Sequence, residues 1–145
     1  MCVSHTYCGR MTTHLETRLK IDSWDEQPYR ELEDGRKFTR ANVALSVAED
    51  GIEARATWDA LLYYAADGTS SYVGLMHVEG RLGDRSGSFV MEGAGAYDGT
   101  RASGESTVVP GTATGELQGL RGTSRSVSTH ADYPFMPLTL DYEVG

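Results

Sequence analysis

Hydrophobic and polar residues alternate along most of this chain, which is the pattern of β-strands that bury one face. Leu15 to Asp22 places apolar residues or Thr at every second position, with charged residues between them. Phe38 to Ala48 and Ile52 to Tyr64 continue the alternation. A period of two residues over such lengths predicts half-buried strands. Five further segments share it: Tyr72–Leu82, Ser88–Tyr97, Arg101–Val109, the more polar Thr123–His130, and Leu138–Val144.

The segments between these strands carry no helical period. Gln27 to Lys37 is polar, contains Pro28 and ends in Asp34-Gly35, so it is predicted to be a connection. Thr112 to Gly122 is predicted to hold one short turn at most. The pattern therefore predicts an all-β fold with eight strands.

Asp-Gly dipeptides, a strong hairpin signal, stand at Asp34, Asp50, Asp67 and Asp98. Glycine suits such turns because it adopts positive φ without a Cβ clash, and this chain has 17 glycines. Consecutive strands joined by short turns predict an antiparallel meander, which closes into a barrel or folds into a sandwich. We favour an eight-stranded antiparallel barrel, because closure removes exposed sheet edges.

The length of each turn sets which residues share a face. A two-residue turn at Asp50-Gly51 pairs Val43 with Trp58, so both point to the same side. A three-residue loop, 66–68, pairs Leu62 with Tyr72, whereas a two-residue turn there would move an apolar set outward. Two-residue turns are expected at Asp84-Arg85 and at Asp98-Gly99.

This register predicts an inward face that mixes large apolar residues with small ones. Small inward residues leave space in a barrel of eight strands, which predicts a hydrophobic pocket. The alternative is that Trp58, Tyr64 and Tyr72 fill the centre and the glycines only relieve strand bending. The residues expected to line the pocket are Trp58, Leu62, Tyr64, Tyr72, Met76, Phe89, Met91, Gly93, Ser106 and Tyr142.

The charge and composition of the chain limit the classes of molecule that it is expected to bind. The 145 residues contain 13 Lys and Arg against 21 Asp and Glu, a net charge of −8. This disfavours nucleic acid and anionic membrane surfaces as partners. The longest apolar run, 60–66, is far short of a membrane span. Both cysteines, Cys2 and Cys8, lie near the start, which favours a reduced, cytoplasmic setting over a disulfide framework.

The first residues differ from the rest. Residues 1–11 lack the apolar run and cleavage site of a signal peptide, and we interpret them as a disordered or mis-assigned leader. Residues 12–145 are predicted to form a single barrel domain.

Motifs for familiar chemistry are missing from the sequence. No G-x-S-x-G nucleophile elbow occurs, and Gly93-Ala94-Gly95 lies within a predicted strand rather than at the start of a helix. The four histidines are scattered, so no metal site is expected. His77 is predicted to face outward, and His130 to lie at a barrel rim, where hydrogen bonding to a loop is favoured over titration. No cofactor is expected.

The sequence resembles a bacterial family of uncharacterised proteins with an allene oxide cyclase-like barrel. The resemblance extends from about Thr12 to Glu143. It rests on eight runs in one order: Ser23-Trp24-Asp25-Glu26, Asp67-Gly68-Thr69, Tyr72-Val73-Gly74-Leu75, Arg85-Ser86-Gly87-Ser88-Phe89-Val90, Val108-Val109-Pro110-Gly111, Thr114-Gly115-Glu116-Leu117, Gly119-Leu120-Arg121-Gly122 and Leu140-Asp141-Tyr142.

The resemblance implies an eight-stranded barrel that assembles as a homo-oligomer, a dimer or trimer. The wider barrel group includes dirigent proteins and spirotetronate cyclases, which steer reactive intermediates through the shape of an apolar cavity. Where this chain has Met76, Gly93 and Ser106, the family commonly has Glu, His and Trp. These departures imply an emptier and more apolar interior here.

Two functional hypotheses follow from the resemblance and the pocket. The first is a cofactor-independent cyclase or isomerase of natural-product biosynthesis, acting on a hydrophobic, polyketide-like molecule. Its candidate catalytic groups are Trp58, Tyr64 and Tyr72, whose N–H or O–H would polarise a substrate carbonyl. The second is a carrier that binds such a molecule without turnover. A third reading is an oligomeric barrel with a filled centre.

Overall fold

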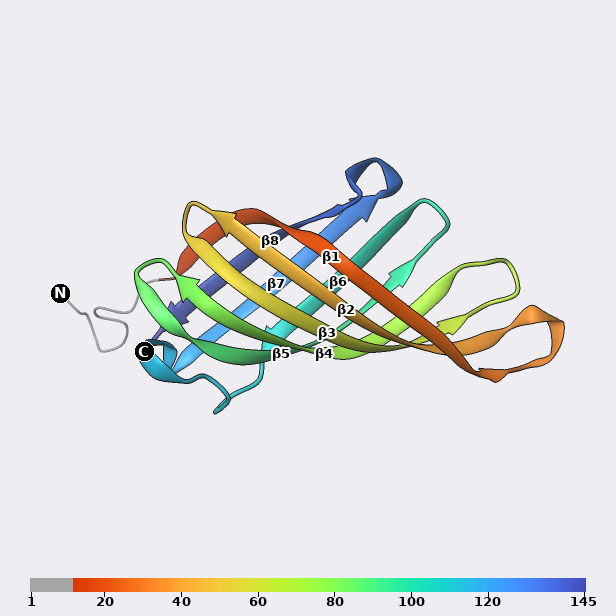
Figure 1. The fold of residues 1–145 in the computed structure, drawn as a ribbon, viewed down its shortest axis with the longest axis horizontal. Coiled ribbons are helices and arrows are strands. Elements are labelled where there is room, and N and C mark those ends of the chain that lie inside the picture. The colour runs from red at the N-terminus through yellow and green to blue at the C-terminus, as the bar shows by residue number, and fades with distance from the viewer. Residues whose placement is uncertain (1–11) are drawn as a thin grey trace, which may run out of the picture.

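The computed structural model describes residues 12–145, which form a closed barrel of eight antiparallel strands in chain order (Figure 1). This confirms the predicted fold class and rules out the sandwich. The predicted leader, residues 1–11, lies outside the described range. The strands are β1 (Thr13–Glu31), β2 (Lys37–Glu49), β3 (Ile52–Tyr64), β4 (Ser70–Leu82), β5 (Arg85–Tyr97), β6 (Arg101–Val108), β7 (Leu120–Thr129) and β8 (Phe135–Val144).

The turn at Asp50-Gly51 has the predicted register. Glu49 pairs with Ile52 and Val43 with Trp58, so the turn has two residues. Gly51 has a φ of +86°, which a side chain would strain. The inward residues of β2 are buried as the alternation requires, and Val43 is 1% exposed. One face of this hairpin therefore points into the barrel and the other into solvent.

The predicted loop between β3 and β4 is also confirmed. The Ala65 N–H donates to the Thr69 carbonyl at 2.9 Å, which encloses residues 66–68. Gly68 has a φ of +89°, and Leu62 pairs with Tyr72. Because this register holds along both strands, Trp58 and Tyr72 face the interior from neighbouring strands.

Two turns lie one residue away from their predicted places. Leu82 pairs with Arg85, so the β4–β5 turn is Gly83-Asp84 and not Asp84-Arg85. The Asp98 N–H bonds the Arg101 carbonyl, so the β5–β6 turn is Gly99-Thr100 and not Asp98-Gly99. In both turns a glycine of positive φ takes the first central position, as in a type II′ turn. Strand partners shift by two residues, so the inward face is unchanged.

Strand β1 is much longer than the alternation predicts. It has 19 residues and includes 27–31, which were predicted to be part of a connection. Register shifts between Ile21 and Ser23 and between Pro28 and Arg30 mark two bulges that interrupt the strict alternation. The connection to β2 is only a short 3-10 turn at Glu33–Gly35. Polar residues are tolerated here because most of this part of β1 is exposed.

A strap, residues 109–119, covers the free edge of β5. β6 is shorter than β5, so the first half of β5 has no strand partner on that side. The strap supplies one: Val109 and Thr114 donate backbone hydrogen bonds to Val90 and Ser88, each at 2.8 Å. It contains the expected short turn, a 3-10 helix at Gly115–Leu117.

One end of the barrel, which we call the closed end, carries the Asp50-Gly51 and Gly83-Asp84 turns. Leu82, Val108 and Leu120 belong to the hydrophobic core and are each at most 4% exposed. The opposite end carries the β1–β2, β3–β4, β5–β6 and β7–β8 connections, which spread apart at the right of Figure 1. We call this second end the mouth. Among residues 12–145, no helix has the length and apolar character needed to span a bilayer.

Candidate functional site

A cavity of about 430 Å³ lies inside the barrel and reaches the mouth beside Gly68, Tyr97 and His130. Inward side chains of all eight strands contribute to its wall, and the wall is largely apolar. The following predicted pocket residues line it: Trp58, Leu62, Tyr64, Tyr72, Met76, Phe89, Met91, Gly93 and Ser106.

Tyr142, the remaining predicted pocket residue, is not part of this wall. It lies near the closed end, where a Cβ at Gly83 would come within 3.6 Å of its hydroxyl. It lines a separate surface hollow together with Leu120 and Gly122. The alternation predicts the face correctly but gives no information on how far the cavity extends along the strand.

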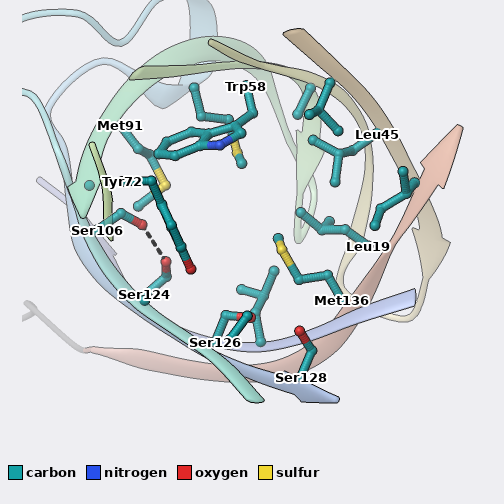
Figure 2. A pocket seen from close by; sticks show the side chains of 18 of the residues that line it. Leu19, Leu45, Trp58, Tyr72, Met91, Ser106, Ser124, Ser126, Ser128 and Met136 are labelled. Atoms are coloured by element: carbon teal, nitrogen blue, oxygen red, sulfur yellow. Dashed lines mark hydrogen bonds between the residues drawn. The ribbon is translucent and has the colours of Figure 1, made fainter. Parts of the chain in front are cut away.

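Trp58 and Tyr72 pack edge to face, with ring centroids 6.4 Å apart. Trp58 lies over Gly74, where a Cβ would come within 3.0 Å of the indole. Tyr72 lies over Gly95, where a Cβ would come within 2.5 Å of the phenol ring. Figure 2 shows open space between these two rings and Leu19, Leu45 and Met136.

These contacts correct the predicted origin of the cavity. The inward glycines of β4 and β5 do not themselves leave the space, since aromatic rings cover two of them. A Cβ at Gly93 would also meet the Ser106 Cβ at 2.7 Å. The glycines instead allow the rings to lie close to the wall, and the centre stays open for that reason. The alternative, in which the aromatic side chains fill the centre, is wrong.

Four serines form a polar strip on the wall made by β6 and β7. The Ser106 and Ser124 hydroxyls are hydrogen-bonded at 2.6 Å, as Figure 2 shows. Ser126 donates to the Pro137 carbonyl at 2.7 Å, and Ser128 follows on the same face. Sequence reasoning identified only Ser106. Serine at every second position from 124 to 128 was the signal that could have revealed the others.

Glu26 lies at the mouth on the inward side of β1. Its carboxylate accepts hydrogen bonds from Thr39 and Tyr64, both at 2.6 Å, and from the Trp24 N–H at 2.9 Å. Burial raises the pKa of Glu26, but these three donors and nearby Lys37 outweigh it and lower the pKa overall. The carboxylate is therefore ionised and fully engaged. Sequence reasoning named no site role for it, because the bulges of β1 hide its inward position.

The three predicted catalytic candidates differ in whether their N–H or O–H is available to a ligand. Tyr64 donates its proton to Glu26, and burial and this bond raise the pKa of the Tyr64 phenol well above its usual value. Burial also raises the pKa of Tyr72, whose hydroxyl donates to the Ser103 carbonyl through a long bond of 3.3 Å. The Trp58 N–H has no hydrogen-bond partner within residues 12–145. The Trp58 N–H can thus donate to a guest, the Tyr72 O–H can do so by exchanging its long bond to the Ser103 carbonyl, and the Tyr64 O–H is already committed to Glu26.

The two histidines singled out by the sequence lie where they were expected. His130 is at the rim of the mouth, where its Nε2 and the Tyr97 hydroxyl are 2.9 Å apart. The two rings also pack edge to face. His77 is exposed on the outer face of β4. Within residues 12–145, no three His, Asp or Glu side chains are grouped to hold a metal ion.

Replacing Gly95 by Ala tests the packing of the Tyr72 ring against Gly95. The new methyl would clash with the Tyr72 ring and with the Ser103 carbonyl, whereas a methyl at Gly104 makes only ordinary contacts at 3.4 Å. We expect Gly95→Ala to lower the free energy of unfolding by about 1–3 kcal/mol. Gly104→Ala should cost less than about 1 kcal/mol. Urea unfolding measures both, and equal losses would contradict the proposed packing.

Replacing Glu26 by Gln tests the ionised carboxylate. The pKa of Glu26 is lowered from 4.5 in the folded protein, so its stabilising effect is present above pH 4.5 and is lost as the pH falls through the folded pKa. The difference in unfolding free energy between the native protein and Glu26→Gln should shrink as the pH falls below 4.5. Urea unfolding between pH 7 and pH 3 measures it, and Glu92→Gln, at an exposed position on the outer face of β5, is the control. A constant difference would contradict this assignment.

Comparisons with known proteins agree with the barrel. Residues 15–142 match a family described as proteins of unknown function, DUF3224. The crystal structure of a DUF3224 protein of unknown function from Shewanella oneidensis MR-1, at 1.84 Å resolution, is similar, with a TM-score of 0.69. It is 24% identical, over 91% of this chain and 97% of that one, which supports the fold alone. No curated protein matches. The family match confirms the resemblance noted in the sequence: this chain belongs to the DUF3224 family.

Proposed function

We propose that this protein binds a hydrophobic small molecule inside the barrel. The observation that carries this proposal is the cavity of about 430 Å³ with a largely apolar wall and a connection to the mouth. Its volume is in the range typical of small-molecule sites, and apolar walls with a few polar groups are characteristic of them. Leaving such a space empty costs stability, and a guest of matching shape recovers the lost contacts.

The second candidate function is catalysis, in which the barrel converts the bound molecule chemically. Trp58 and Tyr72 present an N–H and an O–H on one wall, and their edge-to-face packing fixes both side chains. A donor held in this way can polarise a carbonyl, and a shaped wall can hold a flexible chain in a reactive conformation. The chemistry that fits is cyclisation or isomerisation without a cofactor. The resemblance to barrels that guide cyclisation supports it by analogy of fold.

Binding is tested with N-phenyl-1-naphthylamine, a neutral dye whose fluorescence rises in apolar surroundings. We expect one dye to bind per chain. Ala102 lines the cavity near the mouth, so Ala102→Phe should weaken binding by about tenfold or more. Ala96 is exposed on the outer face of β5, and Ala96→Phe should bind as the native protein does. No binding, or equal binding by both variants, would contradict the proposal.

Turnover is tested with 1,7,9-decatrien-3-one, an achiral linear ketone that closes to a chiral bicyclic ketone without gain or loss of atoms. A catalytic barrel should accelerate closure and give one enantiomer in excess. Ala102→Phe should abolish both effects, whereas Ala96→Phe should retain them. Chiral gas chromatography measures rate and product. A racemic product at the uncatalysed rate would leave binding as the function.

A further inference from the structure

We propose that the molecule bound in the cavity is neutral and elongated, with hydrogen-bonding oxygens spaced along one edge. The serines of β6 and β7 would recognise those oxygens. This inference rests on the proposed binding function and adds the chemical class of the ligand to it. Three observations carry it: the spacing of the serines, the hydrogen bonds that they already make, and the distribution of charge around the cavity.

The serines form a regularly spaced row. Ser124, Ser126 and Ser128 are alternate residues of one strand, so neighbouring side chains on this face lie about 6.8 Å apart. Ser106 is paired with Ser124 across the ladder and joins the row at its deeper end. All four line the cavity. In Figure 2 they occupy one side, and Leu19, Leu45 and Trp58 lie across the open space.

The hydrogen bonds within this row determine what each serine can still offer. A hydroxyl has one donor and two acceptor sites. The Ser106–Ser124 pair uses one proton, so one O–H remains for an acceptor such as a ketone oxygen. Ser126 donates its proton to the Pro137 carbonyl and can only accept, so it suits a ligand hydroxyl. Ser128 makes no side-chain hydrogen bond within residues 12–145 and can do either.

Across the cavity from the serines the wall is mainly apolar, and the Trp58 N–H is among its few polar groups. Leu19, Leu45 and Met136 are apolar, so a molecule with oxygens on every side would leave some of them unpaired. An unpaired polar group in an apolar site costs roughly 1–3 kcal/mol. A ligand with its oxygens along one edge and hydrocarbon along the other avoids this cost.

The charged groups near the cavity exclude an anionic ligand. Arg55 and Glu105 contribute to the wall, but both belong to outward positions, and Glu105 lies 3.9 Å from Arg125 on the outer surface. Lys37 lies by the mouth over the Tyr64 ring, beside the ionised Glu26. Within residues 12–145, Arg55 is the one Lys or Arg in the wall and its position faces outward, so a carboxylate inside the cavity would meet no inward-facing Lys or Arg there. A neutral molecule has no such penalty.

The inference is tested by displacement of bound N-phenyl-1-naphthylamine. The competitors are undecan-2-one, 8-hydroxyundecan-2-one and undecanoate. The hydroxyketone places its two oxygens on carbons six bonds apart, so in an extended chain both point to the same edge at roughly the spacing of neighbouring serines. We expect it to displace the dye at about three- to tenfold lower concentration than the ketone, the effect of one hydrogen bond. Undecanoate should be the weakest competitor.

Serine variants assign the effect to the row. Ser126→Ala should remove the advantage of the hydroxyketone and leave the ketone unchanged. The double variant Ser106→Ala with Ser124→Ala should weaken both ketones by about three- to tenfold. Ser71 is exposed on the outer face of β4, and Ser71→Ala should change nothing. Retained binding of the dye shows that each variant is folded.

The outcomes separate this inference from the binding function. If the native protein fails to bind the dye, the binding function itself is overturned, and this inference with it. If the dye binds but the hydroxyketone gains nothing, or Ser126→Ala leaves its advantage intact, the role of the serines is overturned and binding stands. Displacement by undecanoate as efficient as by the ketones would overturn the neutral character of the ligand.

Discussion

Closing eight strands into one barrel pairs the backbone of each strand with both neighbours and sends alternate side chains to an interior of fixed width. The volumes of those inward side chains then decide whether the interior is filled. Here large buried apolar residues such as Val43 and Leu45 occupy inward positions of β2, whereas serines and glycines occupy many inward positions of β4 to β7. Core and cavity are thus two results of a single alternation, and their boundary depends on residue size.

The cavity depends on contacts between the smallest and the largest residues of the wall, in which an aromatic ring packs over a glycine. Trp58 and Tyr72 together could close the centre, but Gly74 and Gly95 let their rings lie against the neighbouring strands. A bare glycine position in a strand lowers stability, and covering it with an aromatic ring recovers part of the loss. The same contact thus stabilises the wall and keeps the centre open. It also fixes the direction of the two donors that face the cavity.

More of the fold than of the candidate site can be predicted from the sequence. Alternation and Asp-Gly turns were sufficient for the β2–β3 and β3–β4 registers, because an apolar set would face water in a register shifted by one residue. They failed for Glu26. Its inward position results from the bulges in β1, and no residue type in the sequence predicts those bulges. They also failed for Ser124 to Ser128, since a polar inward row resembles a weak strand. Tyr142 was assigned to the right face, but its distance from the mouth follows from the barrel as a whole.

The strap gives this closed barrel a seam. Along the first half of β5, the wall is completed by a loop that contributes backbone hydrogen bonds, hydrogen bonds accepted by the side chains of Thr112, Thr114 and Glu116, and the buried side chain of Leu117. Detaching a loop costs less than separating two long strands, and local opening follows the least stable segment. The barrel therefore has a line along which it can part without losing its other strand pairings.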